Sequence, residues 1–247
     1  MTPFFMAWMM FLALPCPSKK WDDSKKSQML AAYPFIGLIV GGIWLGIYKL
    51  CGILHLGFVG LALTAVLPWL LTGFMHIDGF MDSADAVLSF KDREKRIEIL
   101  KDSHVGSFAV ICTAVLSVFI LAAWLQTGYR AKLWALLLIP VAVRSVISAC
   151  VLSFEPLKTS GYSGMKKDGA DKGRALFCVI LAALCCVLGF VLCGVQGASV
   201  IAGAVSALAV VLIIRHNLGG MSGDISGSAL TIGEACAVTA LALTAAV

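Results

Sequence analysis

Charge is scarce in this 247-residue sequence. Only 13% of the residues are Asp, Glu, Lys or Arg, while 60% are hydrophobic. An ordinary soluble domain is excluded, because such domains carry about a quarter charged residues. A disordered chain is excluded as well, since disorder requires low hydrophobicity and the mean hydropathy here is +0.95. The composition therefore predicts a protein whose surroundings are largely lipid.

Patterns that would indicate a metal–thiolate site or a disulfide framework are missing. The nine cysteines fall almost wholly in apolar runs and form no C-x-x-C pair. We interpret them as small buried side chains in a reducing compartment. The net charge of +5 is modest, and loop orientation explains such an excess in a membrane protein. We therefore predict no nucleic-acid partner.

Long uncharged runs dominate the chain. A helix needs about 20 apolar residues to cross a bilayer, and seven uncharged stretches approach that length. We predict an all-α fold, a polytopic membrane helix bundle of about seven spans, in a single domain covering residues 1–247. A shorter run, Pro3–Leu14, lacks the basic start and cleavage site of a signal peptide and is expected to be an N-terminal interfacial helix. The predicted spans are Pro34–Tyr48, Leu56–Phe74, Ser107–Thr127, Leu133–Phe154, Ala175–Val195, Ala198–Ile214 and Ser228–Val247.

Lys and Arg gather on one side of this layout. Lys49, Arg130 and Lys132 fall on one side, Arg144 falls inside a span, and the others fall on the opposite side. All 14 acidic residues are expected on that charged side or its membrane edge. Because cytoplasmic loops hold most Lys and Arg, we predict a multi-pass protein of the cell (inner) membrane whose active site faces the cytoplasm. The residues of the charged side are Lys19, Lys20, Lys25, Lys26, Lys91, Arg93, Lys95, Arg96, Lys101, Lys158, Lys166, Lys167, Lys172, Arg174 and Arg215.

The most informative segment reads H-x-D-G-x-x-D-x-x-D and begins at His76. On a helix, Asp78, Asp82 and Asp85 share one face. Carboxylates so placed repel one another at a membrane edge, and a cation or protonation relieves the repulsion. Oxygen ligands without a Cys or His cluster favour Mg²⁺, with Mn²⁺ as the alternative, over zinc. Gly79 would let a phosphate approach the backbone.

The alternative for this segment is a solvated acidic helix start, stabilised by the helix dipole. Apolar residues between the acids and the adjacent span favour a binding site instead. His76 is either a hydrogen-bonded boundary residue or a base.

Two later segments carry further polar candidates. Arg93–Gly106 is predicted to be an amphipathic helix that returns to the membrane. Its mixed charges at i, i+4 spacing usually pair within the helix, whereas Asp102 and Ser103 are better candidates for a metal or phosphate contact. Arg144, within an apolar run, is expected to pair with a carboxylate or a substrate phosphate, or to snorkel. The basic loop Glu155–Arg174 would attract a polyanionic substrate or anionic lipid equally.

A glycine-rich segment precedes the last predicted span. It contains Gly219, Gly220 and Gly223, whose backbone N–H groups could bind an anion, and Asp224 could add a carboxylate to the metal. The segment lacks the P-loop and dinucleotide-binding fingerprints. The alternative is a flexible loop between helices.

Taken together, these segments resemble the cobalamin synthase (adenosylcobinamide-GDP ribazoletransferase) family over essentially the whole chain. His104, in place of a usual basic residue, and Ser222, in place of a usual Thr, depart from the family pattern, and Tyr162–Gly173 matches it poorly. The matching pieces are Leu14–Pro17, Pro34–Gly37 with Gly41 and Gly42, Thr72–Asp85, Glu98–Gly106 and Leu218–Asp224.

The resemblance implies a Mg²⁺-dependent transfer of phosphocobinamide from adenosylcobinamide-GDP to α-ribazole or its 5′-phosphate, with release of GMP. Phosphoryl transfer depends on metal and on positioned donors, which suits the segments described above. The expected catalytic residues are His76, Asp82 and Asp102, with His76 or Asp102 taking the proton of the ribazole hydroxyl. The expected metal ligands are Asp78, Asp82, Asp85 and Asp224. The expected substrate-binding residues are Gly79, Lys101, Ser103, Arg144, Gly219, Gly220, Ser222 and Gly223.

Two rival functions remain open from the sequence. A CDP-alcohol phosphotransferase has a superficially similar acidic pattern, but its full pattern is missing here. A small transporter would place charge near the midplane and show repeat symmetry, and no repeat is evident. The sequence leaves open whether the acceptor is phosphorylated and whether the chain forms a homo-oligomer.

Overall fold

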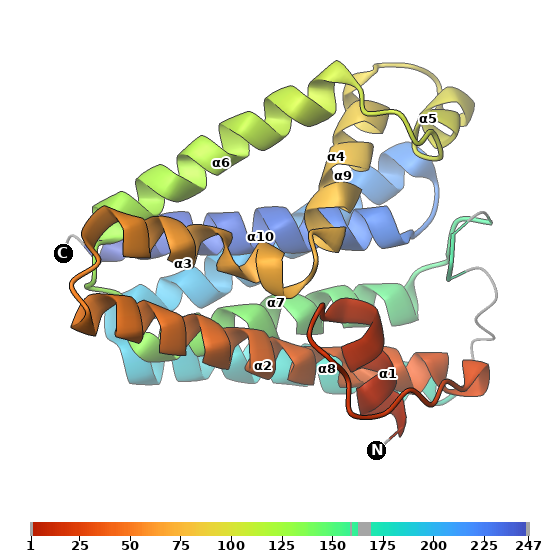
Figure 1. Cartoon of the computed structure of the whole chain (residues 1–247). Helices are drawn as coiled ribbons and strands as arrows, with labels where there is room; N and C mark the ends of the chain where they lie inside the picture. Colours follow the sequence, from red (N-terminus) through yellow and green to blue (C-terminus); the bar gives the residue numbers. More distant parts are fainter. Residues whose placement is uncertain (1, 159, 163–168, 246–247) are drawn as a thin grey trace.

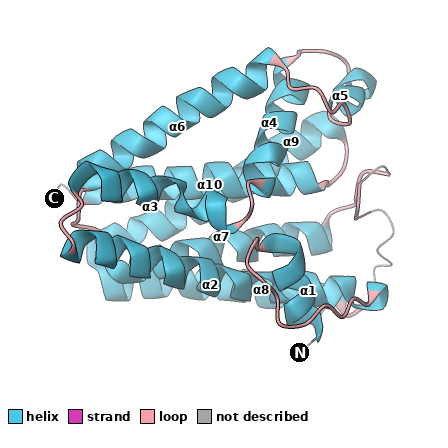
Figure 2. Ribbon diagram, in the orientation of Figure 1, coloured by secondary structure: helices cyan, strands magenta, loops and turns pink. Residues whose placement is uncertain are grey.

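The computed structural model describes residues 2–158, 160–162 and 169–245, and these residues are helical with short connections (Figure 1). No strand is present in this part of the chain, which confirms the all-α prediction (Figure 2). The helices are α1 Thr2–Phe11, α2 Lys26–Ile53, α3 Gly57–Leu71, α4 Met75–Leu88, α5 Arg93–Ile99, α6 Ser107–Thr127, α7 Leu133–Ser153, α8 Asp171–Cys193, α9 Ala198–Leu218 and α10 Gly223–Thr244, with 3₁₀ turns η1 Asp23–Lys25 and η2 Gly194–Gly197.

Five helical stretches within the described residues are long and apolar enough to cross a membrane, or six if the bent pair α3 and α4 forms one span. The prediction of about seven spans exceeds this number because α8, η2 and α9 form one continuous helical stretch, Asp171–Leu218. That stretch reverses direction. A Cβ on Gly197 would lie 2.3 Å from the carbonyl carbon of Gly189, whereas eight residues along a straight helix span about 12 Å. Two antiparallel helices therefore occupy the positions of the predicted fifth and sixth spans.

The core of the bundle surrounds α7. This helix is buried along nearly its whole length and packs against α2, α8, α9 and α10. Glycine makes the closest of these contacts possible: a Cβ on Gly37 or Gly41 would lie within 2.8 Å of backbone atoms of α7. The α1 helix, predicted to be interfacial, packs against α2 and buries Met6, Ala7 and Phe11.

A sharp bend separates α3 from α4, and the two helices meet at 85°. The chain turns at Gly73 and Phe74, which have φ values of 59° and 62°. The Pro68 carbonyl accepts hydrogen bonds from both the backbone N–H of Thr72 at 3.3 Å and its hydroxyl at 2.9 Å, so Thr72 holds the end of α3 with two bonds. As a result, α4 leaves the direction of α3 and carries the acidic segment toward α10.

The charged segments lie at one end of the bundle. Helix α5, the α9–α10 connection and the end of α7 are at this end, whereas the α2–α3 and α6–α7 connections and the C-terminus are at the other (Figure 1). Lys166 and Lys167 of the predicted basic loop lie outside the described residues.

Two details of the predicted layout, one position of a charge and one helix boundary, are wrong. Glu234 does not lie at a membrane edge but is buried inside α10, because Arg144 pairs with it there. The predicted amphipathic helix Arg93–Gly106 ends at Ile99, and Gly106 instead becomes the N-cap of α6.

Candidate active site

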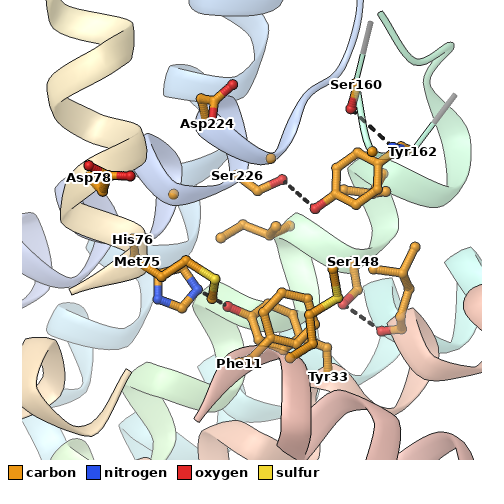
Figure 3. A pocket seen from close by; sticks show the side chains of 17 residues that line it. Phe11, Tyr33, Met75, His76, Asp78, Ser148, Ser160, Tyr162, Asp224 and Ser226 are labelled. Atoms are coloured by element: carbon orange, nitrogen blue, oxygen red, sulfur yellow. Dashed lines mark hydrogen bonds between the residues drawn. The ribbon is translucent and has the colours of Figure 1, made fainter. Parts of the chain in front are cut away.

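A cavity of about 240 Å³ opens where α4 and α10 meet α1, α2 and α7. Asp78 and Asp224 line one side of it, and Phe11 and Tyr33 line the opposite side (Figure 3). Of the lining residues, Asp78 and Gly223 are exposed, as are Met10 and Met75, whereas Phe11 and Tyr33 are buried. The cavity therefore has a mouth that includes the acidic residues, and an aromatic floor. The other described residues that line it are Leu30, His76, Ile147, Ser148, Val151, Ser160, Gly161, Tyr162, Ser226 and Gly227.

Two glycines bring α4 and α10 into contact beside the cavity. A Cβ on Gly79 would lie 2.9 Å from the Cα of Asp224, and one on Gly227 would lie 2.8 Å from the His76 carbonyl oxygen. The Ser228 hydroxyl also donates to the Gly79 carbonyl at 3.1 Å. The backbone of Asp224 thus occupies the space beside Gly79, so this glycine has a packing role, and its predicted contact with phosphate stays a prediction.

This packing groups three carboxylates from segments far apart in the sequence. The carboxylate of Asp82 is repelled by those of Asp78, Asp224 and Asp85. Asp78, Asp82 and Asp224 form no ion pair with Lys or Arg among the described residues. Asp224 accepts a hydrogen bond from the Ser222 hydroxyl at 3.3 Å. The group therefore carries negative charge that no described cation offsets.

Such oxygen donors suit Mg²⁺, although the described side chains do not form a complete metal cage. No three His, Cys, Asp or Glu side chains converge on one point in residues 2–158, 160–162 and 169–245. Mg²⁺ commonly takes only one or two protein carboxylates and completes its shell with water and substrate phosphates. Asp78 and Asp224, which face the same cavity mouth, meet that smaller requirement.

Asp85 is turned away from this group. Its carboxylate accepts hydrogen bonds from the backbone amides of Gly106 at 2.7 Å and Ala109 at 3.0 Å. Both its oxygens thus satisfy free N–H groups at the start of α6. The structure gives Asp85 a capping role that competes with its predicted role as a metal ligand.

His76 lies in the wall of the cavity and is paired with Tyr33. The Tyr33 hydroxyl and His76 Nε2 share a hydrogen bond of 2.8 Å, and both side chains are buried. His76 Nδ1 is also buried and has no hydrogen-bond partner among the described atoms. If Nε2–H donates to the tyrosine oxygen, Nδ1 carries the lone pair and can accept a proton.

The structure places Lys101, Asp102 and Ser103 on the exposed connection between α5 and α6, and none of them lines the cavity. Asp102 accepts hydrogen bonds from the backbone N–H of His104 at 3.0 Å and from its Nδ1 at 2.7 Å. These two bonds lower the pKa of Asp102 below its ordinary value. Because Asp102 is exposed and does not line the cavity, it is not positioned to take a proton from a substrate bound there.

The glycine-rich segment is held in place by its neighbours. Gly219 has a φ of 87° and lies against the Arg93 guanidinium. A Cβ on Gly220 would lie 2.8 Å from the Leu157 amide nitrogen. The Ser222 hydroxyl accepts from the Ile225 amide and caps α10. Gly223 differs, because it lines the cavity and has open space at its Cβ position. Of the residues in this segment that were predicted to contact phosphate, Gly223 is the one whose backbone a ligand in the cavity could approach.

Arg144 is fully buried and does not reach the cavity. Its Nη1 lies 2.7 Å from Glu234 Oε1, and its guanidinium carbon lies 5.6 Å from the centre of the Tyr33 ring. Of the two predicted partners, a carboxylate and a substrate phosphate, the structure supplies the carboxylate.

Six polar or aromatic residues of the cavity were not predicted from the sequence: Phe11, Tyr33, Ser148, Ser160, Tyr162 and Ser226. Each lies in an apolar run or a weakly patterned loop, where one aromatic or hydroxyl side chain does not stand out. The spacing of Ser226, two residues after Asp224, is the one signal that could have indicated it.

The chain is similar to proteins of one family. A family model described as cobalamin-5-phosphate synthase matches residues 3–242. An adenosylcobinamide-GDP ribazoletransferase of Clostridium botulinum (strain Alaska E43 / Type E3) is 32% identical over 93% of this chain and 92% of the relative. Proteins of the same name from Clostridium perfringens (strain 13 / Type A) and Geobacillus thermodenitrificans (strain NG80-2) are 32% and 30% identical; the alignments cover 91% and 94% of this chain and 91% of each relative. No solved structure gives a significant match.

Proposed function

The chain belongs to the cobalamin-5-phosphate synthase family, and from this premise we propose that it is a magnesium-dependent adenosylcobinamide-GDP ribazoletransferase. It would transfer phosphocobinamide from adenosylcobinamide-GDP to α-ribazole or α-ribazole 5′-phosphate and release GMP. The product is adenosylcobalamin or its 5′-phosphate, so the reaction completes the nucleotide loop of cobalamin.

One observation carries this proposal: the acidic face of α4 and the start of α10 meet at the mouth of a single cavity. Asp78 and Asp224 are 146 positions apart in the sequence, yet both line that mouth. Transfer of a phosphoryl group from a diphosphate requires its charges to be offset and its reacting groups to be positioned. A cluster of carboxylates that no described cation offsets, beside a cavity, would provide a place for the cation that such chemistry needs.

Asp78 and Asp224, which both line the cavity, are the residues that would hold Mg²⁺, or Mn²⁺ in its place, and Asp82 would add a third negative charge beside them. When bound, the ion would offset the negative charge of the diphosphate and of the departing GMP. The open space at Gly223 would let the backbone at the start of α10 contact a phosphate oxygen, favoured by the helix dipole. Asp85 is left out of this ligand set because its oxygens bind the amides of α6.

His76 would accept the proton of the ribazole hydroxyl at Nδ1. Tyr33 would fix the orientation and tautomer of the imidazole by accepting the Nε2–H hydrogen bond. A base held in this way typically contributes a factor of about 10² to 10⁴ in rate.

The charged end of the bundle, which holds the cavity mouth, would face the cytoplasm of the cell (inner) membrane. This assignment rests on the excess of Lys and Arg in the connections at that end.

Metal-dependent release of GMP tests the proposal. Full-length protein purified in detergent should release GMP from adenosylcobinamide-GDP only when α-ribazole and Mg²⁺ or Mn²⁺ are present, and a chelator should stop the reaction. Asp82→Asn should lower turnover at least about a hundredfold, the scale of one lost electrostatic contact to the transition state. Glu98→Gln provides the matched control, because Glu98 is an exposed carboxylate on α5 that pairs with Lys95.

Three results would contradict the proposal. Full activity in Asp82→Asn would remove the metal-site assignment, and turnover in the presence of chelator would remove metal dependence. If the protein transferred no phosphocobinamide to α-ribazole or its 5′-phosphate, and instead turned over a CDP-alcohol with an alcohol acceptor, the rival phosphotransferase would be supported.

A further inference from the structure

We infer that the inner part of the cavity binds the benzimidazole base of the acceptor, while the donor reaches the site only from the mouth. This inference rests on the proposed function and assigns its two substrates to different parts of one site. It also identifies residues that would set the size of the base that the enzyme accepts.

The size of the cavity excludes the donor as its main occupant. Ligand pockets for drug-sized molecules commonly enclose about 300–1,000 Å³, and this cavity encloses about 240 Å³. A corrinoid joined to GDP is far larger than such a space. A bicyclic heteroaromatic base is of the right size, and its ribose would then extend to the mouth.

The inner wall is suited to a flat aromatic ring. Phe11, Tyr33 and His76 lie side by side, with ring planes 20° to 39° apart and centroid separations of 4.1 to 6.3 Å. Buried apolar side chains of α7 and α2 complete the wall, including Ile147 and Leu30. Burying an aromatic base here would combine removal of apolar surface from water with ring–ring contact.

Hydrogen bonding argues against guanine, the other base present in the reaction. Guanine has several ring-edge donors and acceptors, each of which needs a partner when buried. The Ser148 hydroxyl already donates to the Leu30 carbonyl and the Ser226 hydroxyl to the Ser222 carbonyl, so neither has a hydrogen left for the acceptor atoms of guanine. A benzimidazole attached to ribose retains one acceptor nitrogen, so its burial leaves fewer groups unsatisfied.

The cavity runs from the aromatic rings to the carboxylates, and this direction fits the proposed transfer reaction. With the base against Phe11 and Tyr33, the ribose hydroxyls would lie toward Asp78 and Asp224 (Figure 3). The diphosphate of the donor would approach the same carboxylates from outside. Acceptor oxygen and phosphorus would then meet at the mouth, with the corrinoid remaining outside the cavity.

Enlarging the cavity at Ile147 tests the inference. Ile147→Ala should raise the ratio of kcat/KM for a bulkier naphthimidazole riboside to that for α-ribazole at least about tenfold. The KM for adenosylcobinamide-GDP should stay within a factor of two. Ile139→Ala is the matched control, because it removes the same atoms from the buried part of the same helix but away from the cavity. Because the measured quantity is a ratio within one variant, partial loss of folded protein does not change it.

Direct binding gives a second measurement that does not depend on turnover. Calorimetric titration of the full-length protein in detergent with α-ribazole, in the presence of a chelator, should show binding to the wild type. Ile147→Phe, which fills the cavity, should weaken that binding at least about tenfold and leave the affinity for GMP unchanged.

The outcomes separate this inference from the proposed function. The inference is overturned if Ile147→Ala leaves the ratio of kcat/KM for the two ribosides unchanged, or if Ile147→Phe selectively loses affinity for GMP. The proposed function still holds in either case if the wild type releases GMP only in the presence of α-ribazole. Absence of GMP release by the wild type with any acceptor overturns the function itself.

Discussion

At the scale of single residues, the helix bundle contains one buried pair of opposite charges among the described residues. Arg144 and Glu234 are both buried, and they form an ion pair at 2.7 Å inside the helix bundle. A charge left without its partner in such a place is costly, whereas replacing the whole pair with apolar side chains is often neutral. The pair therefore offers a clear test of its contribution to stability.

We expect Arg144→Met to lower the free energy of unfolding by about 3–5 kcal/mol, because Glu234 would remain as an unpaired buried carboxylate. The double variant Arg144→Met/Glu234→Leu should recover most of this loss. Denaturant unfolding in detergent, followed by circular dichroism, measures both. A double variant as unstable as the single one would show that the pair is not the source of the effect.

The hydrogen bond between Tyr33 and His76 is expected to act as one catalytic unit. His76→Ala should lower kcat by about 10² or more, on the scale of general base catalysis, and Tyr33→Phe should lower it less. Adding Tyr33→Phe to His76→Ala should cause little further loss, because residues that act together are not additive. Single-turnover GMP release by the wild type, the two single variants and the double variant gives the four rates that are needed. Fully additive losses would show that Tyr33 and His76 act independently.

At the scale of elements, the contact between α4 and α10 positions the carboxylates. The bend at Gly73 and Phe74 directs α4 away from α3, and Gly79 lets it rest on the backbone of Asp224. The acidic pattern of α4 would have little chemical value without this contact, since Asp224 is supplied by another helix.

We expect Gly79→Ala to lower kcat/KM by about tenfold or more, because its Cβ would meet the Asp224 Cα at 2.9 Å and push the two helices apart. Gly46→Ala on α2 is the control, since nothing lies within 4 Å of its Cβ position. Steady-state GMP release gives the comparison. Equal activity in the two variants would show that the α4–α10 spacing does not govern the site.

At the scale of the whole molecule, the helix bundle separates charged from uncharged connections. The connections that contain most of the Lys and Arg lie at the same end as the cavity mouth. Orientation in the membrane then decides which compartment supplies the substrates.

Reporter fusions would test this orientation. Alkaline phosphatase, which is active only outside the cytoplasm, should be active when fused after Arg130 and inactive when fused after Ser89. A green fluorescent protein fused at the same two positions should give the opposite result. The reverse pattern with both reporters would place the active site outside the cytoplasm.

Much of the architecture follows from the sequence alone. Apolar runs of about 20 residues predict helices, because a backbone in lipid must satisfy its hydrogen bonds within the segment. The nine cysteines are unpaired, as their apolar surroundings predicted. The sequence also predicted that the acidic and glycine-rich segments approach each other, and one residue of each, Asp78 and Asp224, lines the same cavity.

Other features depend on contacts that no local pattern contains. Helical spacing placed Asp85 on the same face as Asp82, but the start of α6 binds its carboxylate. The predicted charge layout placed Glu234 at a membrane edge, but Glu234 pairs with Arg144 in the core of the bundle.

Local hydrophobicity, spacing and charge were enough to predict the helical class, a multi-pass membrane protein and the two polar segments proposed as the site. Which carboxylates line the cavity, which partner His76 has and how large the enclosed space is follow from the tertiary fold. These properties arise from the directions of side chains on helices that pack together from distant parts of the chain, and the missing Cβ atoms of Gly79 and Gly227 let α4 and α10 make that contact.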